Sequence, residues 1–415
     1  MVVSAPIIAG GDDTASNRSA SASADFWGQV GFAYQAQDED WKGYGFGDKE
    51  DNAFSAAVIL GVEKAWGLGL GFGAEVAGWS DLGLDIADKA RVESGDQTAA
   101  EISQAYLMYR SGETAVKVGR QALPKALSPW AWTVRTAGVV DWAYDGVLVT
   151  NTALPDTTMI GGWVMRISHS SDEEYRISDR GGLLILGAVN RSIPDTKVSV
   201  SGYYLPKSLH DINRYDYGAG GIPVIDNGAK DVWSIWADSV TNYHGAKVGI
   251  QGVYVDGDYA GTGATYAVAG KIASSLGRLN ATIAASYINN GDYSLRLAGT
   301  KLEDSALWTD NEESGDIIRH YNPLVNMDYS QGQVAVLATF GYRLAFGRLY
   351  GSLGYWDYDH ARSGDQTESF GGRVGYGFDL SGVRTRVEYR YRDRALKESD
   401  DQKRQRIRIE AYYKF

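Results

Sequence analysis

The sequence predicts an all-β fold: a transmembrane antiparallel β-barrel of about eighteen strands, with short periplasmic turns and long extracellular loops. First, apolar and polar residues alternate with period two in many segments, as expected when successive side chains of a strand point to opposite faces. Second, the links between these segments are alternately short and long. Third, 51 Gly, 27 Tyr and 12 Trp stand beside only 8 Pro in 415 residues, which suits bent strands that carry interfacial rings.

The strand segments follow one another along the chain after an N-terminal lead-in. They are expected at 25–36, 53–64, 68–79, 101–111, 114–121, 144–151, 157–168, 181–191, 197–206, 231–241, 246–256, 264–274, 279–290, 333–344, 348–358, 367–379, 383–393 and 404–415. Most approach the ~9–11 residues that a tilted membrane strand needs. Residues 1–24 are expected to be a flexible lead-in, and residues 25–415 a single barrel domain. No basic stretch followed by an apolar core is visible, so we expect the mature form of an exported chain.

The connections favour a barrel over other all-β folds. Short links such as 65–67, 111–113 and 381–382 alternate with long polar ones, which predicts tight turns on the periplasmic side and loops on the outer side. A sandwich or a propeller has no reason to alternate in this way. The outer loops 47–52 and 303–316 are rich in acids and could bind Ca²⁺ through oxygen ligands, although solvated loops are the commoner outcome.

The composition argues against several classes of function. Without cysteine, neither disulfides nor thiolate metal sites form. The net charge of −12 argues against nucleic-acid binding. The five histidines are scattered without metal-binding or catalytic spacing, so we expect no metal centre, no cofactor and no enzyme. A mean hydropathy of −0.28 suggests a soluble protein, but only half of each membrane strand is apolar, so this index misses barrels.

A column of arginines marks the C-terminal strands. In VRTRVEYRYRDR (383–394), the arginines and Glu388 share one parity, while Val, Thr and Tyr share the other. A charge on the lipid face costs ~2–4 kcal/mol near the midplane, so the column is expected to face the lumen. The expected pore-lining basic ladder, which includes two positions of strand 114–121, consists of Lys117, Arg120, Arg373, Arg384, Arg386, Arg390, Arg392, Arg404, Arg406 and Arg408.

Two interpretations of this ladder remain open. The arginines can simply pair with Glu388, Glu410 and loop carboxylates, because barrel walls are often charged. Alternatively, their guanidinium forks form a track along which a carboxylate or similar anion is exchanged stepwise. Conduction needs sites that admit a solute and still release it, which a ladder supplies better than one tight pocket.

The third long link, 122–143, carries little charge for a surface loop. Its Trp and Val residues predict packing against other parts of the protein, and the lumen is the available space, so we expect it to fold inward and constrict the pore. The alternative is that it covers the barrel mouth or a subunit interface. The expected constriction residues are Pro124, Lys125, Trp130, Trp132, Arg135 and Asp141.

The blocks AYLMYR, VKVGRQ and YDGVLVTN, between residues 105 and 151, resemble the outer-membrane porin D (OprD) superfamily and related Opr-type major porins of proteobacteria. The resemblance implies passive diffusion of small solutes, often organic anions, past a third-loop constriction and a wall of arginines, and it implies a homotrimer. The loop departs from the family by lacking an acidic cluster. The terminal Phe415, with Tyr413 two residues before it, resembles the signal that the barrel-assembly machinery recognises in Gram-negative outer-membrane barrels.

Together these features predict a porin of the Gram-negative outer membrane, in contact with its lipids and lipopolysaccharide. The expected solutes are small hydrophilic molecules, above all anionic or carboxylate-bearing ones. A general or cation-preferring porin with acidic, Ca²⁺-binding loops is the alternative that the net charge of −12 supports. A surface adhesin or a barrel enzyme is the remote alternative.

Overall fold

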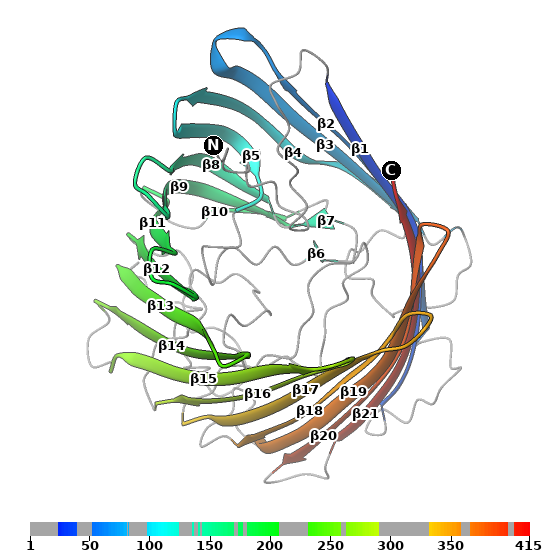
Figure 1. The fold of residues 1–415 in the computed structure, drawn as a ribbon. Coiled ribbons are helices and arrows are strands. Elements are labelled where there is room, and N and C mark those ends of the chain that lie inside the picture. Colours follow the sequence, from blue (N-terminus) through cyan, green and yellow to red (C-terminus); the bar gives the residue numbers. More distant parts are fainter. Residues whose placement is uncertain are drawn as a thin grey trace.

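A single sheet closes into a barrel in the structure, which is a computed structural model (Figure 1). Nineteen strands of the described residues form one antiparallel sheet, in which β1 (Asp25–Glu39) pairs with both β2 (Asn52–Ala65) and β21 (Gln402–Lys414). The described residues are 24–39, 52–80, 82, 98–123, 135–136, 140–141, 143–169, 173–176, 181–206, 231–258, 263–289, 332–357, 366–396 and 402–415. The sheet has no free edge at its seam, so the expected closed barrel is confirmed.

The expected number of strands is also confirmed. The remaining strands of the wall are β3 (Leu70–Ser80), β4 (Thr98–Ser111), β5 (Thr114–Gln121), β8 (Ala143–Asn151), β9 (Thr157–His169), β11 (Leu183–Asn190), β12 (Thr196–Leu205), β13 (Val232–Tyr243), β14 (Ala246–Gly257), β15 (Thr265–Leu276), β16 (Leu279–Ile288), β17 (Val334–Arg343), β18 (Arg348–Asp357), β19 (Gln366–Leu380) and β20 (Val383–Leu396). The short β10 (Glu173–Arg176) only extends β9, which leaves eighteen strands in the wall. Each expected segment coincides with one wall strand, and the ends differ by at most three residues.

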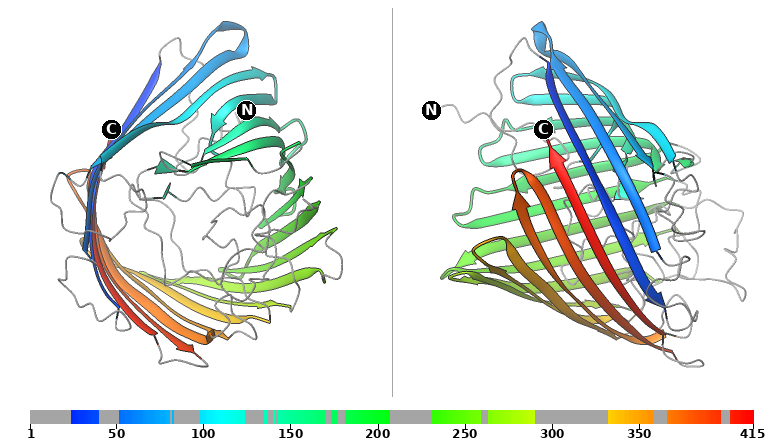
Figure 2. Two further views of the ribbon diagram at one scale, coloured as in Figure 1. Left: turned by 180° about the vertical axis from the view of Figure 1, so that it is seen from behind. Right: turned by 90° about the vertical axis from the view of Figure 1, so that its right-hand side faces the viewer.

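The two ends of the barrel differ in their connections. Tight turns at one end include 112–113, 244–245 and 381–382, where Ser381 and Gly382 have φ of 53° and 86°. Such paired positive φ angles match the right-handed twist of the strands in a two-residue hairpin. Another turn at this end, between β2 and β3, contains the one-turn helix η3 (Gly67–Gly69). The strands run obliquely across the wall in the side view (Figure 2).

Among the described residues, no helix has the length and apolar character needed to cross a membrane.

Apolar side chains cover the outside of the wall, with aromatic residues near both of its ends. Alternation is clear in β17, where Val334, Val336 and Phe340 are 41–46% exposed while Leu337 is 2% exposed. Exposed aromatic residues at the short-turn end are Trp66, Tyr109, Tyr243, Tyr342, Phe346, Tyr413 and Phe415. Those toward the long-link end are Trp163, Tyr204, Trp233, Tyr254, Tyr266, Tyr287, Tyr355 and Phe370. Two such belts are typical of the two membrane–water interfaces.

Two adjacent aromatic residues near the end of β18 lie on opposite faces of the wall. Trp356 is only 2% exposed, whereas its neighbour Tyr355 is 42% exposed. Strand alternation puts adjacent residues on opposite faces, so Tyr355 alone of this pair belongs to the outer belt. Trp356 projects toward the inside of the barrel.

The two strands that flank the third long link are short. β5 has 8 residues and β8 has 9, while the adjoining β4 has 14 and β9 has 13. A small hairpin of β6 (Arg135–Thr136) and β7 (Val140–Asp141) belongs to this link. Seen along the barrel axis, β6 and β7 lie within the outline of the wall (Figure 1).

Candidate functional site: the inner wall of the barrel

The arginines of β20 and β21 lie on the inner face of the barrel. On this face Glu388, Arg390, Arg406 and Arg408 are 1–5% exposed. On the opposite parity the apolar residues are far more open, for example Val387 at 41%. Since the exposed apolar parity is the lipid face, the arginine column lines the interior. The inward orientation of the arginine column follows from the alternation of side chains along each strand.

Glu388 is the centre of a first cluster of charges. Its carboxylate forms an ion pair with Nε of Arg390 on the same strand, and its Oε2 lies 3.8 Å from Nη1 of Arg373 on β19. The hydroxyl of Tyr350, on β18, donates a hydrogen bond to Oε2 at 3.0 Å. The guanidinium of Arg373 also lies 5.9 Å from the Tyr350 ring centroid. One buried carboxylate therefore joins three neighbouring strands.

Glu410 is the centre of a second cluster, one step nearer the short-turn end. Nη2 of Arg386 lies 2.8 Å from Oε2 of Glu410, directly across from it in the β20–β21 register. Arg408 forms an ion pair with the other oxygen. These contacts fix the two guanidinium groups in place, because a carboxylate accepts charge-assisted hydrogen bonds on both of its oxygens.

Three carboxylates cannot neutralise this wall. Among the described side chains, the inner parity of β19–β21 carries eight arginines and Lys414 beside Asp379, Glu388 and Glu410, which leaves a formal excess of about six positive charges. Arg390 and Arg406 face each other directly, and so do Arg392 and Arg404. The column from Arg384 to Arg392 rises roughly 26 Å at ~3.3 Å per residue, before any tilt. The ladder thus runs through most of the height of the membrane.

Two residues of β5, Lys117 and Arg120, were expected in the ladder. Lys117 lies on the inner wall, but away from the arginines of β19–β21. Nζ of Lys117 lies 3.8 Å from Oε2 of Glu63 on β2 and 4.1 Å from the ring centroid of Tyr106 on β4. The Tyr106 hydroxyl donates to the same Glu63 oxygen at 2.6 Å. Lys117 therefore faces inward as expected, but its charge is compensated locally by Glu63.

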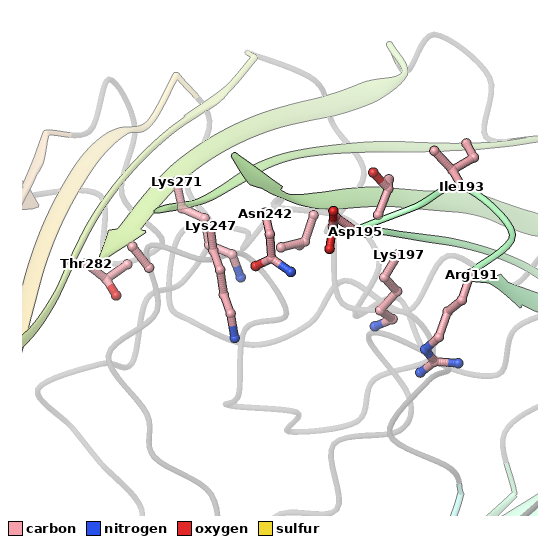
Figure 3. A pocket seen from close by; sticks show the side chains of 11 residues that line it. Arg191, Ile193, Asp195, Lys197, Asn242, Lys247, Lys271 and Thr282 are labelled. Carbon is pink, nitrogen blue, oxygen red and sulfur yellow. The ribbon is translucent and has the colours of Figure 1, made fainter. Parts of the chain in front are cut away.

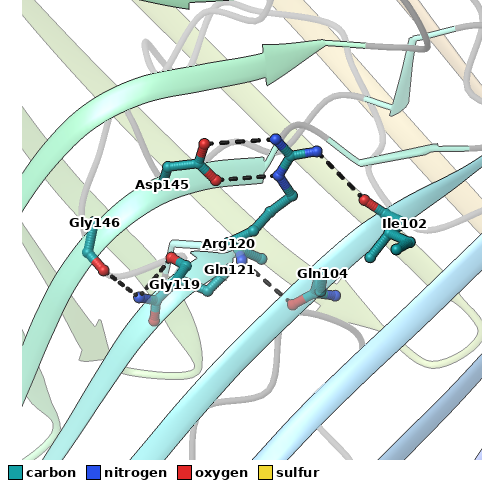
Figure 4. Close-up of polar contacts among 8 residues, drawn as sticks. Ile102, Gln104, Gly119, Arg120, Gln121, Asp145 and Gly146 are labelled. Carbon is teal, nitrogen blue, oxygen red and sulfur yellow. Dashed lines mark hydrogen bonds and ion pairs between the residues drawn. The ribbon is translucent and has the colours of Figure 1, made fainter.

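The expectation that Arg120 lines the pore is wrong. Arg120 pairs in register with Ala105, which is exposed on the outer face, and it shares a parity with Val118. Figure 4 shows its guanidinium group between Asp145 and Ile102. Its Nε and Nη2 lie 3.1 and 3.5 Å from the two carboxylate oxygens of Asp145. Its Nη1 donates to the carbonyl of Ile102 at 3.5 Å. Strand alternation places the charge of Arg120 on the outside of the wall, and the ion pair with Asp145 compensates it there.

Most of the expected constriction lies outside the described residues. Pro124, Lys125, Trp130 and Trp132 fall there. For Arg135 and Asp141 the backbone alone is described, and the two residues are directly paired in the β6–β7 hairpin. The constriction of the lumen by this link therefore stays a prediction.

A second basic region lies on another sector of the inner wall and was not predicted. At the short-turn end of β12–β15, a recess of about 540 Å³ is lined by four cations and by polar groups (Figure 3). The cations are Arg191, Lys197, Lys247 and Lys271. Each lysine stands alone in its strand, so the sequence offers no column comparable to the arginine ladder. The available signal is that all three share the inner parity.

The remaining expectations concern metals and the C-terminus. No group of His, Cys, Asp or Glu suited to hold a metal ion occurs in the described part of the chain. The acidic loops 47–52 and 303–316 lie outside it, apart from Asn52. Phe415 closes the seam: its backbone N–H and C=O exchange hydrogen bonds of 2.9 and 2.8 Å with Gly28 of β1.

The fold and the charged inner wall define the class of closed, eighteen-strand barrel found in porins. Among solved structures, the chain is similar to OpdK of Pseudomonas aeruginosa, described as an outer membrane protein (TM-score 0.64, 11% identity, 94% of this chain and 99% of that one). It is also similar to OccAB4 of Acinetobacter baumannii (TM-score 0.64, 12% identity, 94% and 98%) and to OccK3 of P. aeruginosa (0.60, 13%, 94% and 96%). These neighbours are porins of the OprD/Occ family, so the expected likeness to that family is confirmed for the fold. No protein-family model and no curated protein matches the sequence.

Proposed function

We propose that the protein is a channel of the Gram-negative outer membrane through which small hydrophilic solutes diffuse passively, with a preference for carboxylate-bearing anions. The observation that carries the proposal is the inward ladder of eight arginines on β19–β21, where the described carboxylates of the same parity are Asp379, Glu388 and Glu410. Guanidinium groups present donor forks that match a carboxylate in two-point contact. Neighbouring arginines along one column offer a solute successive equivalent sites, so that it is passed on and never trapped.

Three features support this proposal over a purely structural ladder. The positive charge exceeds what Glu388 and Glu410 balance on these strands. Nη1 of Arg390 is buried and donates no hydrogen bond within the described structure. One structural neighbour, OpdK, was crystallised with vanillate, an aromatic carboxylate (TM-score 0.66, 11% identity). A buried donor such as Nη1 of Arg390 is stabilised when an anion accepts a hydrogen bond from it.

The setting of the channel is part of the same proposal. The exposed apolar wall between two aromatic belts is suited to outer-membrane lipid, with lipopolysaccharide beside the belt of the long-link end. The link 122–143, including the β6–β7 hairpin, narrows the lumen. Tyr413 and Phe415 serve as the signal for the barrel-assembly machinery, and the chain assembles as a homotrimer.

Solute uptake into liposomes tests the proposal with molecules of one size. Benzoate and benzamide have nearly the same shape and differ in charge, so the ratio of their entry rates reports selectivity. We expect benzoate to enter faster through the wild type, and the ratio to fall toward one in Arg390→Gln/Arg406→Gln. The matched control is Arg343→Gln/Arg348→Gln, two arginines of β17 and β18 outside the ladder. Entry of neither solute would contradict a channel, and preferential entry of cations would favour the cation-preferring alternative.

A further inference from the structure

The recess at the short-turn end of β12–β15 carries a different kind of positive charge from the ladder. In the ring of eighteen strands, β12 lies nine strands from β21 and β15 lies four strands from β19, so the two basic regions occupy different sectors of the inner wall. The strand cations of the recess are all lysines: Lys197, Lys247 and Lys271. On β19–β21 the ladder consists of eight arginines, and Lys414 is the lysine on the same parity. The two sectors therefore offer mainly different donors to a solute.

The three lysines belong to one site because of the sheet register. Lys247 starts β14 beside Asn242 of β13 and Ala273 of β15, and Lys271 pairs with Gly249, two residues further along β14. Diagonal neighbours of this kind lie about 7–8 Å apart. Lys197 is two strands from Lys247, about 10 Å across the sheet. Flexible four-carbon stems allow all three ammonium groups to converge on one compact ligand.

The charges around the recess favour an anion. Arg191, in the turn before β12, adds a fourth cation to the lining. Two carboxylates oppose them: Asp195 lines the recess, and Asp238 interacts electrostatically with Lys197 and Lys271. Four cations against two carboxylates leave a formal excess of about two positive charges. Figure 3 shows Lys197, Lys247 and Arg191 extending from the strands on the same side.

We infer that this recess is a second anion site, at the short-turn mouth of the barrel, which binds compact multivalent oxyanions of the phosphate class. An ammonium group is a point charge without the planar fork that matches a carboxylate, and lysines suit the round charge distribution of a phosphate. Asn242 and Thr282 in the lining add neutral groups able to donate hydrogen bonds to such an oxyanion. The site is separate from the ladder in place and in donor type.

Equilibrium binding of inorganic phosphate to the folded barrel in detergent tests this inference without requiring conduction. The protein is titrated by calorimetry at low ionic strength and slightly alkaline pH, where phosphate is a dianion. We expect saturable binding whose dissociation constant rises at least about tenfold in Lys197→Gln/Lys247→Gln/Lys271→Gln. Binding should remain within about twofold of wild type in Arg343→Gln/Arg348→Gln, which removes two cations from the same end of the barrel outside the recess.

Three outcomes would overturn the inference. Phosphate affinity that is unchanged in the triple lysine variant, or that falls equally in the arginine control, would leave only non-specific attraction to a positive mouth. Affinity that instead falls in Arg390→Gln/Arg406→Gln would place phosphate on the ladder. If the triple variant does not fold, the single variant Lys247→Gln replaces it, with a rise of at least about threefold expected. A barrel that binds phosphate but admits no solute would contradict the proposed channel and leave this site standing.

Discussion

Arg390 of β20 and Arg406 of β21 stand directly opposite each other on the inner wall, and each is at most 5% exposed. Like charges directly opposite across two strands destabilise a sheet. The next pair toward the long-link end is again two arginines, Arg392 and Arg404. A wall built for stability alone gains nothing from this arrangement. A wall that receives anions gains a site between each pair, because an anion between two guanidinium groups offsets their repulsion.

The first prediction is that Arg406→Gln stabilises the barrel. The substitution removes one of two facing charges, so the free energy of unfolding should rise by about 0.2–1 kcal/mol. Urea unfolding in lipid vesicles, followed by tryptophan fluorescence, measures the change. Arg386→Gln is the control, because it loses the 2.8 Å contact with Glu410 and should destabilise the barrel. A loss of stability in both variants would show that the facing arginines do not repel each other.

The second prediction concerns Glu388, the buried carboxylate that joins β18, β19 and β20. Glu388→Gln leaves Arg390 and Arg373 without their common counter-charge and should cost about 3–5 kcal/mol of unfolding free energy. Tyr350→Phe removes the hydroxyl that donates the 3.0 Å hydrogen bond to the same carboxylate and should cost about 0.5–1.5 kcal/mol. The two losses of stability are compared through the urea midpoints of unfolding of the two variants. Equal, small effects would mean that the Glu388 charge is not needed to hold the arginines.

The third prediction concerns the end of β5. Gly119 has a φ of +126°, and a Cβ at this position would lie 2.4 Å from the carbonyl oxygen of Ala105. Gly119→Ala should therefore destabilise the barrel by about 1–3 kcal/mol through strain and collision with backbone. Gly161→Ala is the control, because nothing lies within 4 Å of its added Cβ. Equal urea midpoints for the two variants would contradict the described conformation of Gly119.

The fourth prediction is that Phe415 is needed to close the barrel. Its backbone exchanges two hydrogen bonds with Gly28, and its ring lies where a Cβ on Gly28 would be. Deleting Phe415 removes the backbone pairing as well as the ring, whereas Phe415→Ala removes the ring alone. The folded fraction, read from the heat-dependent shift in gel mobility, should fall in both variants and more in the deletion. A full folded yield for the deletion would mean that the seam closes without this residue.

The fold was predictable because two independent sequence signals mark the strands of a membrane barrel. Lipid requires apolar residues at every second position, and the connections alternate in length, so each of the eighteen expected segments matches a wall strand. The inward column of arginines followed from the same alternation. These features depend only on the local sequence and on the solvent that each face meets.

The features that the sequence did not predict depend on contacts between segments that are distant along the chain. Arg120 was expected in the pore, but it lies on the parity of Val118, where Asp145 of β8 compensates it. The lysine recess is assembled from Lys197, Lys247 and Lys271 on three strands, and only the register brings them together. No spacing along the chain reveals such a site.

The reversal potential of single channels in a planar bilayer, under a gradient of potassium chloride, tests the anion-guiding role of the ladder most directly. The wild-type channel should prefer chloride, and Arg390→Gln/Arg406→Gln should shift the reversal potential toward zero. Arg343→Gln/Arg348→Gln should leave it nearly unchanged. A cation preference that is unaltered by the loss of Arg390 and Arg406 would contradict the account.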